Sequence, residues 1–139
     1  MGEVVVEVRL ENTIDRGMAR RGLIKEENVR SITTRAVVDS GAVMLVLPQD
    51  QVEELGLDEL RKAIVTYADE RKEERPVAGA VSVRFGKREA VVECIVGPPG
   101  SEALLGQIPL EAMDLIVDCP RQMLTPRPES PYLPTLKLK

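Results

Sequence analysis

The tripeptide Asp39-Ser40-Gly41 places a carboxylate, a hydroxyl and a glycine inside an apolar stretch, with three apolar residues before it and six after it. By itself such a tripeptide is common in turns, because Asp and Ser side chains hydrogen-bond nearby backbone and Gly tolerates positive φ. A carboxylate framed by apolar strands is costly to remove from water, so it needs a partner or a function. Arg35 is the nearest cation, but four extended residues place its backbone about 13 Å away. The sequence therefore favours a functional carboxylate at Asp39 over a plain turn.

Histidine is absent from the chain, which restricts the chemistry that this carboxylate could join. Ser-His-Asp and Cys-His mechanisms are excluded, and so are metal sites built on imidazole. Cys94 and Cys119 lack C-x-x-C spacing and lie in apolar stretches, so we expect buried free thiols rather than a disulfide or a metal site. Carboxylate chemistry is what remains for hydrolysis.

Composition is that of an ordinary globular chain: 139 residues, 43% apolar and 30% charged, with a formal net charge of -4. The mixed charge and the near absence of aromatic residues argue against a nucleic acid partner. No apolar run approaches the roughly 20 residues that span a bilayer, and the start lacks the pattern of a secretory signal. We therefore expect no membrane partner and a cytoplasmic location.

Hydrophobic periodicity predicts a mostly β chain. Residues 3–10 alternate between apolar and polar positions, which indicates a half-buried strand with Val4, Val6, Val8 and Leu10 on its inner face. Further strands are expected over residues 31–38, 43–47, 64–67, 76–85, 90–96 and 115–117. Short helices are expected over residues 48–55 and 108–113, with a further helical turn over 58–63.

Two polar segments carry less information. Residues 11–30 predict a solvated connection, with a docking loop as the alternative, and the charge run at residues 69–75 predicts a solvated hairpin tip. After Met123 prolines become too dense for a sheet interior. We therefore expect one domain over residues 1–123 and a Pro-rich, largely disordered tail over 124–139, whose last four residues could pair along an edge.

At residues 36–42 the sequence Ala-Val-Val-Asp-Ser-Gly-Ala resembles the active-site loop of retropepsin-like (retroviral-type) aspartic peptidases. That family's second hallmark, two apolar residues and a glycine, is matched by Leu104-Leu105-Gly106, and the expected helix and strand follow in the family's order. The resemblance covers roughly residues 3–118 and is nearest to the bacterial single-domain members. It implies an all-β fold: a closed acid-protease barrel with one or two short helices, acting as a two-fold homodimer.

The resemblance also implies an aspartic endopeptidase mechanism. Two Asp39 carboxylates would meet across the two-fold axis, share one proton and activate a water that attacks a peptide bond. Ser40 stands where most retroviral enzymes carry Thr, and its hydroxyl could bond the opposite loop, while Gly41 completes the catalytic turn. Leu105 and Gly106 would cross beneath the turn, where glycine lets the backbones approach closely. The mechanism requires no metal and no cofactor.

A peptide or protein substrate is expected to lie extended in the groove of the dimer. Val37, Ala42 and Leu104 would line this groove and favour apolar side chains beside the cut.

The hairpin over residues 64–81 sits where the family carries its substrate-covering flap. Backbone N–H groups near Tyr67 and Ala68 could hold the peptide there. Glu70 occupies the tip position that is usually glycine.

Two departures from the family pattern leave a rival open. Val43 and Gln107 stand where viral members often carry an ion pair that locks the dimer, so dimer geometry would rest on other contacts, such as the N-terminal strand and residues 136–139. The rival is a non-catalytic, retropepsin-like dimer that binds peptides or assembles with a partner. A third possibility is a β-barrel assembly domain in which the tripeptide is only a turn. Two further carboxylates, Asp114 and Asp118, follow the glycine element, where capping or solvated roles are favoured.

Overall fold

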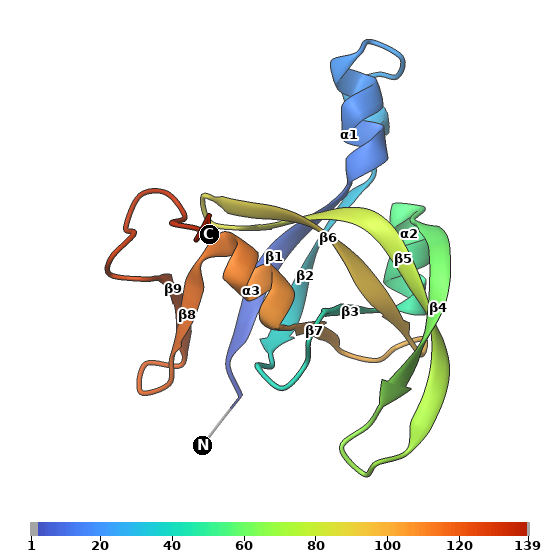
Figure 1. Cartoon of the computed structure of the whole chain (residues 1–139). Coiled ribbons are helices and arrows are strands. Elements are labelled where there is room, and N and C mark those ends of the chain that lie inside the picture. The colour runs from blue at the N-terminus through green and yellow to red at the C-terminus, as the bar shows by residue number, and fades with distance from the viewer. Residues whose placement is uncertain (1–2, 139) are drawn as a thin grey trace.

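The structure is a computed structural model that describes residues 3–138 of the chain. Within these residues the chain forms nine β-strands, three short α-helices and one 3₁₀ turn (Figure 1). The strands are β1 (Val5–Asn12), β2 (Ser31–Val38), β3 (Leu45–Pro48), β4 (Asp58–Thr66), β5 (Lys72–Phe85), β6 (Arg88–Gly97), β7 (Ala103–Leu105), β8 (Leu115–Asp118) and β9 (Met123–Pro126). The helices are α1 (Thr13–Arg20), α2 (Gln49–Leu55) and α3 (Gln107–Met113), and the 3₁₀ turn is η1 (Glu26–Asn28).

Six strands form a closed barrel in the order β1-β2-β7-β3-β6-β5, and an antiparallel pairing of β5 with β1 closes it. The β2–β7 and β3–β6 pairs are parallel, while β4 pairs antiparallel with β5 outside the ring. Figure 1 shows α3 lying across the barrel and the β4–β5 hairpin curling away from it. The predicted closed acid-protease barrel is confirmed, with three α-helices rather than one or two.

Alternating side chains of the strands fill the barrel. Val8 and Leu10 of β1 are buried, and Val6 packs against the same core, so the predicted inner face is confirmed. Leu45 and Leu105 are fully buried on the inside. The core is therefore made of aliphatic side chains, as the scarcity of rings in the sequence requires.

The segment predicted as a solvated connection contains helix α1, which projects from the barrel (Figure 1). The buried side chain of Asn12 caps the helix by accepting from the Asp15 N–H at 3.0 Å. The buried Asp15 carboxylate accepts from the backbone and guanidinium of Arg30. Hydrogen bonds from Arg30 also hold the pKa of the Asp15 carboxyl below its usual value. The segment is largely solvated, as predicted, but it also contains a helix, which is held by these polar contacts and not by an apolar face.

The predicted helical turn at residues 58–63 is wrong: the segment is the first part of β4. It pairs with β5 from Asp58↔Gly79 to Thr66↔Lys72, with a register shift between Glu59 and Arg61. Long-range pairing here overrides the local helix preference. The helix predicted after Pro48 is confirmed as α2, which ends at Gly56 with a φ of 63°.

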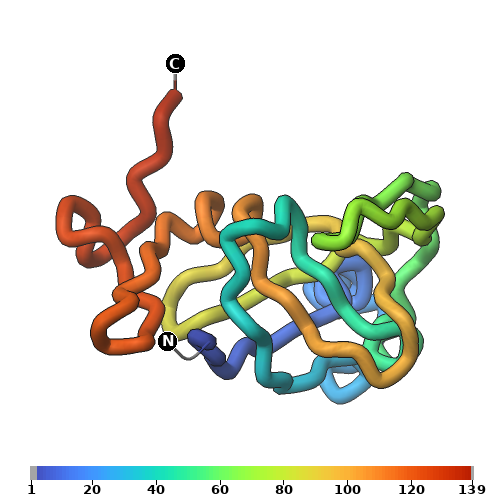
Figure 2. The backbone as a smooth tube through the Cα atoms, turned by 90° about the horizontal axis from the view of Figure 1, so that it is seen from below, coloured from blue at the N-terminus to red at the C-terminus, as the bar shows by residue number. Residues whose placement is uncertain are grey.

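The C-terminal segment is tied to the body of the protein. Strand β9 crosses the boundary predicted between residues 123 and 124 and pairs with β8 in a separate two-stranded sheet. Leu115 of β8 and Leu124 of β9 enter the core. Figure 2 shows the last residues, in red, running away from the barrel; residues 136–138 form no strand, and Lys139 lies outside the described residues.

None of the helices within residues 3–138 is long and apolar enough to cross a membrane.

Candidate active site

Hydrogen bonds within the turn and to β7 hold the turn after β2 in place around Asp39. The Asp39 N–H donates to the Leu105 carbonyl at 3.0 Å, and the Ala42 N–H donates to the Asp39 carbonyl at 3.1 Å. One carboxylate oxygen of Asp39 accepts from the Gly41 N–H at 2.9 Å. Asp39 as a residue is half-buried, while Ser40 and Gly41 are exposed in the single chain. The turn thus presents a carboxylate toward solvent and does not seal it in the core.

Gly106 holds this turn against the chain that follows β7. The Gln107 N–H donates to the Ala42 carbonyl at 2.9 Å, and the Ile108 N–H donates to the Val43 carbonyl at 2.8 Å. A Cβ placed on Gly106 would lie 2.7 Å from the Ala42 carbonyl oxygen and closer still to that of Met44. Because backbone atoms cannot yield as a flexible side chain can, only glycine fits this crossing.

A groove with a volume of about 950 Å³ opens beside the turn. Its floor is the outer face of β3 and β7, and the β4–β5 hairpin forms one wall. Its lining residues come from the turn (Asp39, Gly41, Ala42, Val43, Met44), from the barrel face (Val46, Ile95, Val96, Gly97, Leu104), from the loop between β6 and β7 (Pro98, Ser101, Glu102) and from the hairpin (Ala63, Ile64, Val65, Thr66, Tyr67, Ala68, Arg75).

Most of the predicted site residues meet in this groove. The structure brings Asp39, Gly41, Ala42, Leu104 and the two flap residues together there, while Leu105 lies beneath in the core. Val37 pairs with Leu104 but lies one strand farther from the groove. Ser40 sits on the exposed side of the turn, outside the lining of the single chain.

The hairpin tip has a defined conformation. The Tyr67 N–H donates to the Arg71 carbonyl at 2.8 Å, and the Arg71 guanidinium lies 4.3 Å from the centroid of the Tyr67 ring. Glu70 adopts a φ of 67° at the position where glycine was expected. The Tyr67 N–H is thus occupied within the hairpin, and its use for substrate stays a prediction, whereas the Ala68 N–H donates to no backbone carbonyl within residues 3–138.

No second carboxylate of the described chain stands beside Asp39. The parallel register of β2 and β7 puts Asp39 level with Gly106, and the other acidic residue of the groove, Glu102, lies four residues back along the chain. Four extended residues span about 13 Å, which is too far for two carboxylates to share a proton. One chain therefore supplies one carboxylate to this place.

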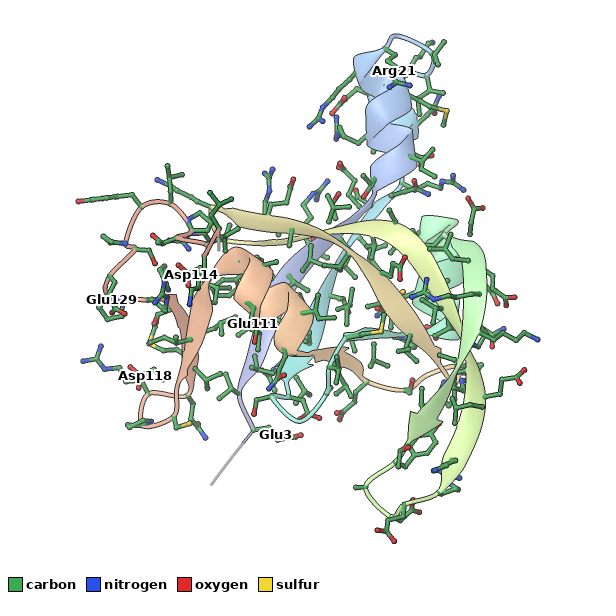
Figure 3. The ribbon with its side chains drawn as sticks, viewed as in Figure 1. Glu3, Arg21, Glu111, Asp114, Asp118 and Glu129 are labelled. Carbon is green, nitrogen blue, oxygen red and sulfur yellow. The ribbon has the colours of Figure 1, made fainter. Side chains whose placement is uncertain are left out.

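Asp114 has a structural role, as Figure 3 and its contacts indicate: it lies where α3 gives way to β8, with Asp118 at the far end of that strand. Its buried carboxylate accepts from Arg127, from the Ser130 hydroxyl and from the Thr135 N–H. The hydrogen bonds from Arg127, and after them those from Ser130 and Thr135, hold the pKa of the Asp114 carboxyl well below its usual range. The residue fastens the C-terminal segment to the end of α3.

Sequence reasoning missed several groove residues. Met44 and Val46 belong to the predicted strand after the turn, but residues 42–47 are all apolar, so no alternation in the sequence distinguishes the outer face from the inner one. Arg75 was hidden inside a charge run; its side chain donates to the Val96 carbonyl at 2.8 Å. Glu102 sits in a loop with no periodicity, so no sequence signal pointed to it.

The two cysteines differ in environment. Cys94 is a buried free thiol, as predicted, and burial raises its pKa to about 12. Cys119 is free but exposed, because it lies in the turn between β8 and β9 rather than in the core. Within residues 3–138, no group of three acidic or cysteine side chains is placed to hold a metal ion.

Comparison with known proteins agrees with the geometry of the barrel and the turn. The aspartyl protease family profile matches residues 26–108, more than half of the chain, and this span contains both the Asp39 turn and the Gly106 crossing. No curated protein matches the sequence significantly. The chain belongs to the retropepsin-like aspartyl protease family.

Proposed function

We propose that the protein is an aspartic endopeptidase that works as a two-fold homodimer, with a water activated between two Asp39 carboxylates. The main support for this proposal is that the site in one chain is incomplete, with only one carboxylate. A turn held rigidly by the Gly106 crossing presents the carboxylate of the half-buried Asp39 at the mouth of a peptide-sized groove. Peptide hydrolysis by carboxylates needs an acid and a base together, so a second copy must supply the partner.

Pairing two exposed turns would bring the carboxylates side by side. Two carboxylates that close cannot both ionise, so the pair holds one proton and titrates as a unit. The ionised member takes a proton from the bridging water, and the protonated member donates a hydrogen bond to the scissile carbonyl oxygen. As the water attacks, the protonated member gives its proton to the carbonyl oxygen, so a tetrahedral diol forms and the pair still holds one proton. On collapse the pair gives this proton to the leaving nitrogen as the C–N bond breaks. A diol hydroxyl returns its proton to the pair as the C=O bond re-forms, which restores the starting state.

Other residues of the turn would support this pair. The exposed Ser40 hydroxyl is free to reach across the axis to the opposite turn. The substrate would lie extended over Leu104 and Ala42, with the Ala68 N–H of the hairpin available to one of its carbonyls.

A peptide library incubated with the protein from acid to neutral pH tests the proposal. The wild type should cleave, and Asp39→Asn, which keeps the shape of the side chain but removes the carboxylate pair, should not. Equal cleavage by both proteins would remove the assignment. Size measurement over a range of concentrations is the second arm, because a strict monomer that cleaves would contradict the shared site.

The rival function is a dimeric module that binds peptides without cleaving them. Glu70 at the positive-φ position of the hairpin tip, and Val43 and Gln107 in place of an ion pair, are the observations that favour it. If the wild type binds peptides but releases no new amino termini at any pH, and so cleaves none of them, this rival is favoured over the peptidase.

A further inference from the structure

The groove beside Asp39 carries a charge that the proposed chemistry does not use. Its lining is apolar around Leu104 and Val46, but Glu102 enters it from the loop that precedes β7. The direction of the side chain follows from the alternation of extended chain: Glu102 and Leu104 line the groove, while Ala103 between them is buried. Glu102 therefore faces the same space as the apolar floor.

Among residues 3–138, the one cationic side chain that lines the groove, Arg75, is already compensated. Arg75 donates from Nη1 to Glu73 at 3.0 Å and from Nε to the Val96 carbonyl at 2.8 Å, and its side chain is only 17% exposed. These contacts fix the guanidinium to the wall and pair its charge outside the groove. It is not left to neutralise Glu102.

Glu102 itself forms no ion pair with any residue between 3 and 138. The neighbouring hydroxyl, Ser101, donates to the Pro98 carbonyl at 2.7 Å and is not available to it. An uncompensated carboxylate on the wall of a groove attracts a cationic group, and it does so more strongly when a bound peptide excludes water.

We propose that Glu102 is a specificity-determining residue that selects a Lys or Arg side chain of the substrate. This inference rests on the proposed function, since it names the substrate class of the same groove. The strand register places Glu102 about 13 Å from Asp39, so it reads a side chain within about four residues of the scissile bond. A two-fold dimer has one Glu102 on each side of the paired turns, so basic side chains are selected on either side of the cut.

The test compares matched peptides that differ only in Lys, Leu or Glu at each position around a mapped cleavage site. The wild type should show a kcat/KM for the Lys peptide about tenfold above that for the Leu peptide at the selected position, and lowest for Glu. Glu102→Gln keeps the shape of the side chain and should bring the Lys-to-Leu ratio of kcat/KM close to one. Glu102→Lys should make the Glu peptide a better substrate than the Lys peptide. The control is Glu54→Gln, an exposed charge removal on α2 outside the groove, which should leave the ratio as in the wild type.

Two outcomes distinguish a failure of this inference from a failure of the proposed peptidase function. Cleavage that depends on Asp39 but shows the same Lys-to-Leu ratio in the wild type and Glu102→Gln overturns the inference and leaves the peptidase standing. If no cleavage occurs, the same peptides are titrated against the wild type and Glu102→Gln by fluorescence anisotropy. A preference for Lys that is lost in Glu102→Gln supports the subsite in a non-cleaving protein, and its absence overturns it.

Discussion

Asp39 follows strand β2 and Asp114 follows helix α3, and the surroundings of these two aspartates contrast. Asp114 is buried and accepts hydrogen bonds from a guanidinium, a hydroxyl and a backbone N–H. Asp39 is half-buried, and its carboxylate accepts from one backbone N–H of its own turn. A carboxylate whose bonding capacity is filled is fixed in one charge state and serves structure, whereas one with open capacity can exchange protons and bind ligands.

The surroundings of the two residues differ in the same sense. The Asp114 contacts come from the C-terminal segment, which the residue fastens in place. The Asp39 contacts come from the backbone of Leu105 and Gly41, which position the turn without neutralising its charge. Asp39 is therefore the better candidate for catalysis, because its backbone is fixed while most of the hydrogen-bonding capacity of its carboxylate is unused.

Replacing Asp39 and replacing Asp114 should have opposite effects on activity and on stability, and the loss of activity in the Asp39 variant should be the largest of all. Asp39→Asn should lower kcat by about 10²–10⁴-fold, since it removes an acid–base group. Its urea midpoint should be unchanged or higher, because the substitution removes the repulsion between the two carboxylates of the proposed dimer. Asp114→Asn should show the reverse pattern, with lower stability and near wild-type specific activity in its folded fraction. Loss of stability without loss of activity in Asp39→Asn would break the contrast.

The second-largest expected effect is a loss of stability when the Gly106 crossing is disturbed. Gly106→Ala should cost about 1–3 kcal/mol of unfolding free energy or more, because the added Cβ meets the carbonyls of Ala42 and Met44. The matched control is Gly17→Ala in α1, where nothing lies within 4 Å of an added Cβ. That change should stabilise by about 0.5–1 kcal/mol through helix propensity. Urea titrations of the two variants measure both values, and equal effects would contradict the tight crossing.

The smallest effect is the pH dependence of the Asp114 contribution. The folded-state pKa of Asp114 is lowered by its hydrogen bonds, chiefly those from Arg127. Its stabilising contribution is therefore fully present above the unfolded-state value of about 3.9 and is lost as the pH falls below it. Urea midpoints of the wild type and Asp114→Asn should differ most at pH 7, and the difference should shrink steadily as the pH falls below about 3.9. A difference that stays constant with pH would show that ionisation of Asp114 plays no part.

Much of the barrel could be predicted from the sequence because its signals are local. The alternation of Val4 to Leu10 and the helix signals at Pro48 and Gly56 correspond to the inner face of β1 and to α2 in the structure. The aspartate turn and the distant glycine were matched through their order along the chain. Their contact in space, with the Gln107 N–H on the Ala42 carbonyl, is a consequence of the barrel topology.

The errors arose where tertiary contacts decide the structure. Residues 58–63 are helix-compatible alone but become β4 by pairing with β5. Helix α1 is stabilised by the buried Asn12 and Asp15, which read as polar loop residues in the sequence. The Pro-rich tail was expected to be largely disordered, yet Arg88 donates to the Ser130 carbonyl and Asp114 binds Arg127 of that segment. The residues in these two contacts lie far apart in the sequence, and no sequence motif links them.

In the proposed mechanism each active site takes one Asp39 from each of two copies, a requirement that mixing of wild-type and variant subunits tests most directly. Wild type and Asp39→Asn are mixed at constant total concentration, allowed to exchange subunits, and assayed for peptide cleavage. If both carboxylates are needed, activity should follow the square of the wild-type fraction, so an equal mixture retains about a quarter of the activity. A linear dependence, with half of the activity in an equal mixture, would show that one chain carries a complete site and would contradict the account.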